Sequence, residues 1–198
     1  MIFEAIELMR AELQAYILPF SAGMFVEIGS IANVAGTQQD KILVSLVNVE
    51  EETTLRNVPP PFQRNGAGNL EKKQPPVFLN LYVIVCVNYS TEANYGTALQ
   101  WLGRVVQCFQ RKSFHTVANT PEAMNIPAEA ANLRVTTELY SLTFEKLNQL
   151  WGTLGGKQVP SVVYKVRVVE EEAEMQLGEG SAILRIEGRV APVLTNPN

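Results

Sequence analysis

The sequence supplies few of the side chains from which catalytic or metal centres are built. His115 is its only histidine and Asp40 its only aspartate, so a Ser–His–Asp triad would have to use both. Asp40 follows a glutamine pair and precedes an apolar run, an ordinary position for an aspartate in a turn. A zinc site needs three or four nitrogen and sulfur ligands, and beside His115 the chain has only Cys86 and Cys108. We therefore expect no catalytic residue and no metal.

Packing or solvation better explains the other residues that could do chemistry. The three residues Glu50, Glu51 and Glu52 are consecutive, so on an extended chain they point to alternating faces and do not converge on one cation. Trp101 and Trp151 lie on predicted helices at core-like spacing, which favours packing over stacking on a sugar or a base. Both cysteines lie inside apolar elements, and we expect them to be buried free thiols.

The composition indicates a folded protein with much buried surface. Of its 198 residues, 46% are hydrophobic and 18% are charged, whereas about 25% are charged in an average soluble domain. The low charged fraction suggests that neighbouring subunits cover part of the exterior, although a large core would give the same composition. A net charge of −4 argues against a general nucleic-acid-binding protein.

The sequence gives no indication of membrane insertion or of a signal peptide. No apolar run approaches the roughly 20 residues that a membrane-spanning helix needs. Charged residues at positions 4, 7, 10 and 12 interrupt any hydrophobic region of a signal peptide. We therefore expect a protein that is made and folded in the cytoplasm.

Hydrophobic periodicity predicts both helices and strands. Helices are expected at 1–18, at 92–111, and from an N-cap at Thr143 to Leu154. Strands are expected at 24–28, 41–50, 77–89, 133–140, 160–170 and 182–190. Two of them, 41–50 and 77–89, are apolar on both faces and should be covered on both sides, the second as the central strand. The pattern predicts an α/β fold of the α+β type: a mixed, mainly antiparallel sheet of about four to six strands, flanked by about three helices.

A long connection, residues 53–76, separates two of the predicted strands. Loops of this length in compact domains are commonly functional or disordered, and the triple proline at 59–61 favours stiff polyproline II. This connection is locally basic, so it is either a solvated hairpin tip or an arm that docks on a partner. Two further cations share a face of the strand at 160–170, which should meet solvent or an acidic partner surface. The candidate partner interface therefore comprises Arg56, Pro59, Pro60, Pro61, Arg64, Lys72, Lys73, Lys165 and Arg167.

We expect two parts in the chain. Residues 1–171 should form one α/β domain that includes the long loop 53–76. Residues 172–198 should form a C-terminal extension with one strand and a frayed tail.

Several segments, taken in order, resemble one protein family. They are SLVNVEEE at 45–52, LNLYVIVCVNY at 79–89, ELYSLTFEKLNQLWGTLGGK at 138–157 and PSVVYKVRVVE at 160–170. This ordered set is similar to the N-terminal domain of tail-terminator (cap) proteins of extracellular contractile injection systems, which are phage-tail-like particles. The resemblance runs from the N-terminal helix to about residue 171.

The resemblance implies a fold, a function and partners. It implies a phage tail-terminator-like fold and a homo-oligomeric ring of six subunits. Such a ring would close the membrane-distal end of the particle, where it would cap the inner tube and contact the last layer of sheath protein. It implies no enzymatic activity, no cofactor and no transferable site residue. The alternative from the residues alone is a small α/β ligand-binding or enzymatic domain with its site at a sheet edge.

Overall fold

The computed structural model describes residues 1–21, 23–32, 40–52, 62–64, 70–72, 78–121, 126–127, 130–155, 158–170 and 179–180. The chain divides into two compact units. We call the first unit, Met1–Asn57 with Pro76–Ala173, the body. We call the second, Val58–Pro75 with Glu174–Asn198, the arm.

The body is built on one six-stranded sheet, with the strand order β1-β2-β5-β8-β7-β6. Only the β1–β2 pair is parallel, and the other four pairs are antiparallel. This arrangement confirms the predicted mixed, mainly antiparallel sheet. The strands are β1 Phe25–Ile28, β2 Lys41–Glu51, β5 Phe78–Asn88, β6 Phe114–Thr116, β7 Leu133–Tyr140 and β8 Ser161–Glu170.

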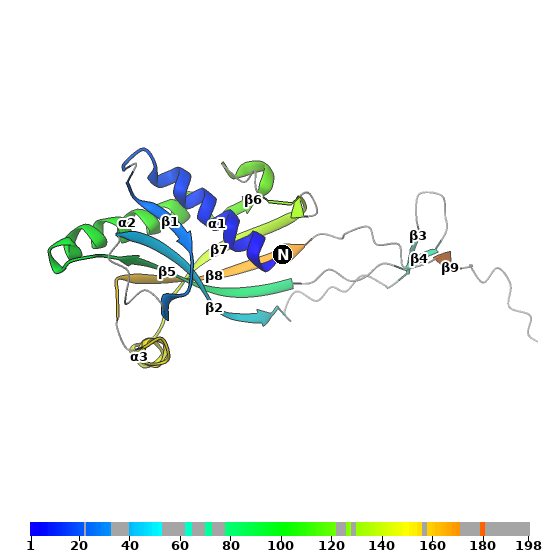
Figure 1. The fold of residues 1–198 in the computed structure, drawn as a ribbon. Coiled ribbons are helices and arrows are strands. Elements are labelled where there is room, and N and C mark those ends of the chain that lie inside the picture. Colours follow the sequence, from blue (N-terminus) through cyan, green and yellow to red (C-terminus); the bar gives the residue numbers. More distant parts are fainter. Residues whose placement is uncertain are drawn as a thin grey trace, which may run out of the picture. The chain divides into compact units, whose positions relative to one another are not determined.

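In the part of the chain that the structure describes, three α-helices cover the two faces of this sheet unequally. They are α1 Ile2–Ile17, α2 Tyr95–Arg111 and α3 Phe144–Thr153, and the short 3-10 turns η2 Glu92–Asn94 and η3 Val117–Asn119 flank α2 and β6. Helices α1 and α2 pack on one face and α3 on the other (Figure 1). None of the helices in the described part of the chain is long and apolar enough to cross a membrane.

Strand β5 is the centre of the core, as its sequence predicts. Val83 and Val85 are fully buried on the face that α1 and α2 cover, and Ile84 and Cys86 are fully buried on the face that α3 covers. Both faces of β5 are apolar because both are packed, which is the usual reason for a strand without alternation.

Strand β2 differs from the prediction that both of its faces are covered. Its first half is buried, but Leu46, Val47 and Val49 are 38%, 38% and 39% exposed. The register of β1 ends at the pair Ile28–Val44, and a register irregularity follows between Leu46 and Asn48. The second half of β2 therefore runs past the elements that bury the first half.

The ends of the helices follow local sequence signals. Thr143 Oγ1 accepts a hydrogen bond from Lys146 N at 3.3 Å, which is the predicted N-cap of α3. Gly155, just after α3, has φ of 101°, a conformation that glycine adopts at low cost. Strand β6 was not predicted because three residues carry too little periodicity to be recognised. The strand predicted at 182–190 lies outside the described residues.

The arm contains a second, three-stranded sheet in the order β3-β4-β9. Its strands are β3 Phe62–Arg64, β4 Leu70–Lys72 and β9 Glu179–Gly180, and both pairs are antiparallel. The segment predicted as a loop thus contributes two strands, and the C-terminal extension contributes the third. Along the chain β3 follows β2, β4 precedes β5 and β9 follows β8. The order β3-β4-β9 in the arm sheet therefore corresponds to the order β2-β5-β8 in the body sheet.

Candidate assembly surfaces

His115 is part of the core. It is fully buried on β6, with its ring edge-on to Phe109 at a centroid distance of 5.8 Å and its Nε2 3.5 Å from Thr137 Oγ1. Burial, assisted by the nearby charge of Lys112, lowers the pKa of His115 to about 4. The ring is therefore neutral at physiological pH and packs as an aromatic side chain.

The cysteines are free thiols inside the core, as predicted. Cys86 and Cys108 are both buried and unpaired. Burial raises the pKa of each thiol to about 12, which leaves almost no thiolate near neutral pH. Neither thiol has the ionised form that nucleophilic or redox chemistry requires.

Asp40 holds a turn in place. Its Oδ1 accepts a hydrogen bond from Ser90 N at 2.6 Å, and its Oδ2 accepts one from Asn94 Nδ2 at 3.0 Å. These bonds fasten the start of β2 to the connection between β5 and α2, so the carboxylate is used structurally. Among the described residues, no three His, Cys, Asp or Glu side chains gather where they could hold a metal ion.

The two predicted interface cations of β8 both have acidic neighbours. On the α3 face of β8, Lys165 Nζ lies 3.8 Å from Glu52 Oε2, and Arg167 donates to Glu138 Oε2 at 3.3 Å. These pairs within the chain reduce the excess positive charge from which contact with solvent or with an acidic partner was predicted. Their part in an interface remains a proposal.

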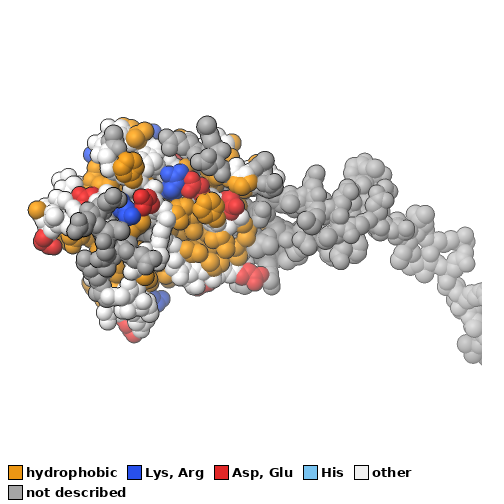
Figure 2. Space-filling view, viewed as in Figure 1, with side chains coloured by type: hydrophobic (Ala, Val, Ile, Leu, Met, Phe, Trp, Pro, Cys, Tyr) orange, Lys and Arg blue, Asp and Glu red, His pale blue; other side chains and the backbone are white. Residues whose placement is uncertain are grey.

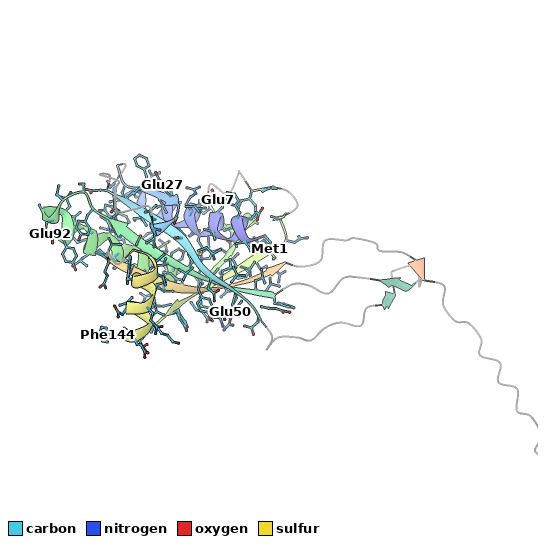
Figure 3. The ribbon with its side chains drawn as sticks, turned by 60° about the horizontal axis from the view of Figure 1, so that its bottom comes forward. Met1, Glu7, Glu27, Glu50, Glu92 and Phe144 are labelled. Atoms are coloured by element: carbon cyan, nitrogen blue, oxygen red, sulfur yellow. The ribbon has the colours of Figure 1, made fainter. Side chains whose placement is uncertain are left out.

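A groove of about 450 Å³ lies beside these charges, between α3 and the sheet. Apolar and aromatic side chains line most of it, including Val47, Tyr140 and Leu142. One of its polar groups, the Tyr82 hydroxyl, already donates to Glu50 Oε2 at 3.0 Å. At the first turn of α3, Phe144 is 92% exposed and points away from the sheet (Figure 3).

An apolar surface lies on the opposite face of the sheet, over the second half of β2. The register places Leu46 opposite Val83 and Val49 opposite Leu81, on the face that α1 and α2 cover elsewhere. We call the surface formed by Ile28, Leu46, Val49 and Leu79 the β2 patch. Leu46 and Val49 are exposed, and Ile28 and Leu79 are half-buried at the edge of the core.

The β2 patch is bordered by charged residues. Figure 2 shows a hydrophobic area over β2 and the start of α1, with both acidic and basic side chains on its border. Glu51, exposed at the end of β2, stands opposite Leu79 on the same face. Exposed apolar areas with a polar rim are typical of protein–protein contacts. Sequence reasoning missed this surface because it depends on where β1 ends.

The remaining interface candidates belong to the arm or to its connections. Arg64 lies at the end of β3 and Lys72 at the end of β4. Arg56, Pro59, Pro60, Pro61 and Lys73 lie outside the described residues. Register pairs Phe62 with Lys72 and Arg64 with Leu70, so these four positions share one face of the β3–β4 pair.

Comparison with known proteins gives a family match and likenesses to solved structures. The Pvc16 N-terminal domain family matches residues 4–185. The sheath/tube terminator of an extracellular contractile injection system, PVC, in its extended state has 16% identity and a TM-score of 0.63, over 98% of this chain and 65% of that chain. The tube-terminating cap of the anti-feeding prophage has 17% identity and a TM-score of 0.64, over 93% of this chain and 59% of that chain.

These likenesses agree with the fold expected from the sequence. Both solved structures confirm the terminator-like fold, although this chain spans less than two thirds of either terminator chain. No curated protein sequence matches. Because the family match extends over nearly the whole sequence, the chain belongs to the Pvc16 N-terminal domain family.

Proposed function

We propose that this protein is a structural cap, a tail terminator that closes the membrane-distal end of the tube and sheath of a contractile injection system. The observation that carries the proposal is the family match over residues 4–185. The fold shared with a sheath/tube terminator and a tube-terminating cap supports it. Its partners are then a tube protein, a sheath protein and further copies of itself, in a particle assembled in the cytoplasm.

The body is consistent with such a role because its chemically capable groups serve the fold. His115 and both cysteines are packed in the core, and Asp40 fastens a turn. What the described surface offers instead is apolar area, at Leu46 and Val49 and at Phe144. Such area is what a subunit of a larger assembly needs to bury.

We propose a closed ring of six copies as the working form. The low charged fraction fits this form, since a subunit in a ring exposes less surface to water. Rings form when two different surfaces of one chain bind each other head to tail and the rotation closes.

The direct test is removal of the gene from cells that produce the particles, followed by electron microscopy of the purified particles. Without the protein, tubes should lack a closed distal end, and their lengths should vary or their sheaths dissociate. Restoring the wild-type chain should restore closed ends of uniform length. Particles of normal length with closed ends in the deletion strain would reject the cap function.

A further inference from the structure

The arm sheet has two faces of opposite chemistry. On the β3–β4 pair, Phe62, Arg64, Leu70 and Lys72 occupy one face, and the register of β9 adds Gly180 to it. The other face holds Gln63, Glu71 and Glu179. One face is therefore apolar and basic, and the other is polar and acidic.

The β2 patch on the body has the matching composition. Leu46 and Val49 present exposed apolar area, and Glu51 borders it on the same face. Arg10, the basic residue of α1, donates two hydrogen bonds of 2.8 and 2.6 Å to Glu7.

We propose that the apolar and basic face of the arm sheet docks on the β2 patch of a second copy of this chain. Phe62 and Leu70 would cover Leu46 and Val49, while Arg64 and Lys72 would face the acidic border at Glu51. The contact rests on the proposed ring and specifies how neighbouring subunits hold each other.

Net charges of the two units support a second copy as the occupant. The body has 11 Lys and Arg against 16 Asp and Glu, whereas the arm has 5 against 4. An arm with a slight positive charge therefore meets a body with a clear negative charge whenever two copies approach. The two surfaces are unlike and lie on different units, so their contact is heterologous, the type that closes into rings.

The position of β9 gives the C-terminal segment a role in this contact. Because β9 pairs with β4 on the side away from β3, the arm is a three-stranded sheet and not an isolated hairpin. Two-stranded hairpins are marginally stable in water, and a third strand supports them. Gly180 lies on the docking face and leaves it without a further side chain at that position.

Cysteine cross-linking between two populations of chains tests the contact. One population carries Arg64→Cys and the other Val49→Cys, and equal amounts are mixed before assembly and treated with a short thiol cross-linker. A product with one chain of each kind arises only between copies. The native thiols give little background because Cys86 and Cys108 are 0% and 2% exposed.

The matched control is Gln63→Cys mixed with Val49→Cys, since Gln63 is the neighbouring position on the opposite face of β3. We expect the Arg64→Cys mixture to give about tenfold more mixed product than the control, the ratio that about 1.4 kcal/mol of preference produces. Equal yields from both positions, in samples whose mass shows rings, would overturn the contact and leave the ring intact. A wild-type chain that stays monomeric with and without tube protein would overturn both.

Charge reversal supplies a second measurement. Replacing Arg64 and Lys72 by Glu should raise the concentration needed for half-maximal ring assembly about tenfold or more, because attraction becomes repulsion at the acidic border. Glu71→Gln, on the other face, should leave that concentration unchanged. Equal weakening by both variants, or cross-linking of Arg64→Cys to tube or sheath protein instead of Val49→Cys, would contradict a second copy as the occupant.

Discussion

At the scale of single residues, polar and potentially reactive side chains stabilise the fold of the body. Gln14 is a further example of a polar side chain with a structural role. Its Oε1 accepts a hydrogen bond from Val26 N at 2.8 Å, and its Nε2 donates to Met24 O at 3.4 Å. One amide on α1 therefore satisfies backbone groups of β1 and of the residue before it, and so links the helix to the edge of the sheet.

Replacing Val85 by Asp should unfold the body far more readily. Val85 is fully buried at the centre of β5, and an unpaired carboxylate there costs several kcal/mol, about 3 or more. Denaturant titration of the free energy of unfolding is the measurement. Val47→Asp is the matched control, because Val47 is 38% exposed and its change should cost less than about 1 kcal/mol. Equal losses in the two variants would contradict the assignment of β5 as the central strand.

His115 should make the body less stable in mild acid. Its pKa is about 4 in the folded protein and 6.5 as the reference value, so below pH 6.5 the unfolded chain binds a proton that the folded chain refuses. The stability contributed by the neutral ring is complete above pH 6.5 and is lost as the pH falls towards 4. At pH 5 the loss should be about 2 kcal/mol.

The variant His115→Gln isolates this effect. Its free energy of unfolding should change less between pH 7 and pH 5 than that of the wild type, while ring assembly at neutral pH persists in both. The same pH dependence in the two proteins would show that other groups cause it. Loss of assembly by a folded His115→Gln protein would assign the ring a role beyond packing.

The sequence predicted the burial of single residues well in the central strand. Val83 and Val85 were recognisable because a strand that is apolar at every position must be covered on both sides. Leu46 and Val49 belong to an equally apolar run, yet they are exposed. The sequence pattern shows that a strand is apolar. How much of that strand is buried depends on the length of the elements beside it, and here the neighbouring strand β1 has only four residues.

At the scale of elements, the helices and long strands were predictable and the short strands were not. The strand β7 alternates cleanly, and α3 has both a cap and a glycine stop, so each carries its own signal. Strands β3, β4 and β9 have two or three residues each and gain their stability from pairing across the chain. The joining of residues near 70 to residues near 180 has no local signal at all.

Removing residues 174–198 should loosen the hairpin between Val58 and Pro75. The truncation deletes β9, so β4 loses one of its two neighbours and a marginally stable hairpin remains. Hydrogen exchange followed by mass spectrometry should show faster exchange at β3 and β4 and unchanged exchange at β5. A chain truncated after residue 180, which keeps β9, is the control. Unchanged exchange in the chain that lacks residues 174–198 would mean that β9 does not support the hairpin.

Replacing residues 59–74 by a short glycine-containing turn should leave the body folded. The loop joins β2 to β5, which are neighbouring antiparallel strands, and closing a loop costs only about 0.6 kcal/mol more per doubling of its length. The shortened chain should therefore show the circular dichroism and melting curve of a folded body. It should fail to form rings or to close particle ends, which electron microscopy would show. Normal closed ends would reduce the segment to a passive loop.

At the scale of the whole molecule, the division into body and arm separates folding from assembly. The body contains the described core clusters and both helix layers, and their contacts are internal to it. The strands of the arm have only two or three residues each, and we propose that the arm serves assembly. The basic, proline-rich composition of residues 53–76 predicts a partner interface there, and this stays a prediction. Its counterpart on the body could not be predicted from the sequence, since the β2 patch exists only once the sheet is assembled.

The ring predicts the number of copies at each particle end. If unlike surfaces on body and arm bind head to tail, every subunit uses both, and the assembly is complete only when the last subunit meets the first. An open chain would leave one apolar β2 patch and one basic arm face unpaired, so a closed ring should dominate over shorter chains. Native mass spectrometry of the purified protein, and counting of copies on isolated particles, should give six per closed end. A single copy per end, or a ladder of open oligomers without a preferred size, would contradict a closed ring and with it the head-to-tail use of the two surfaces.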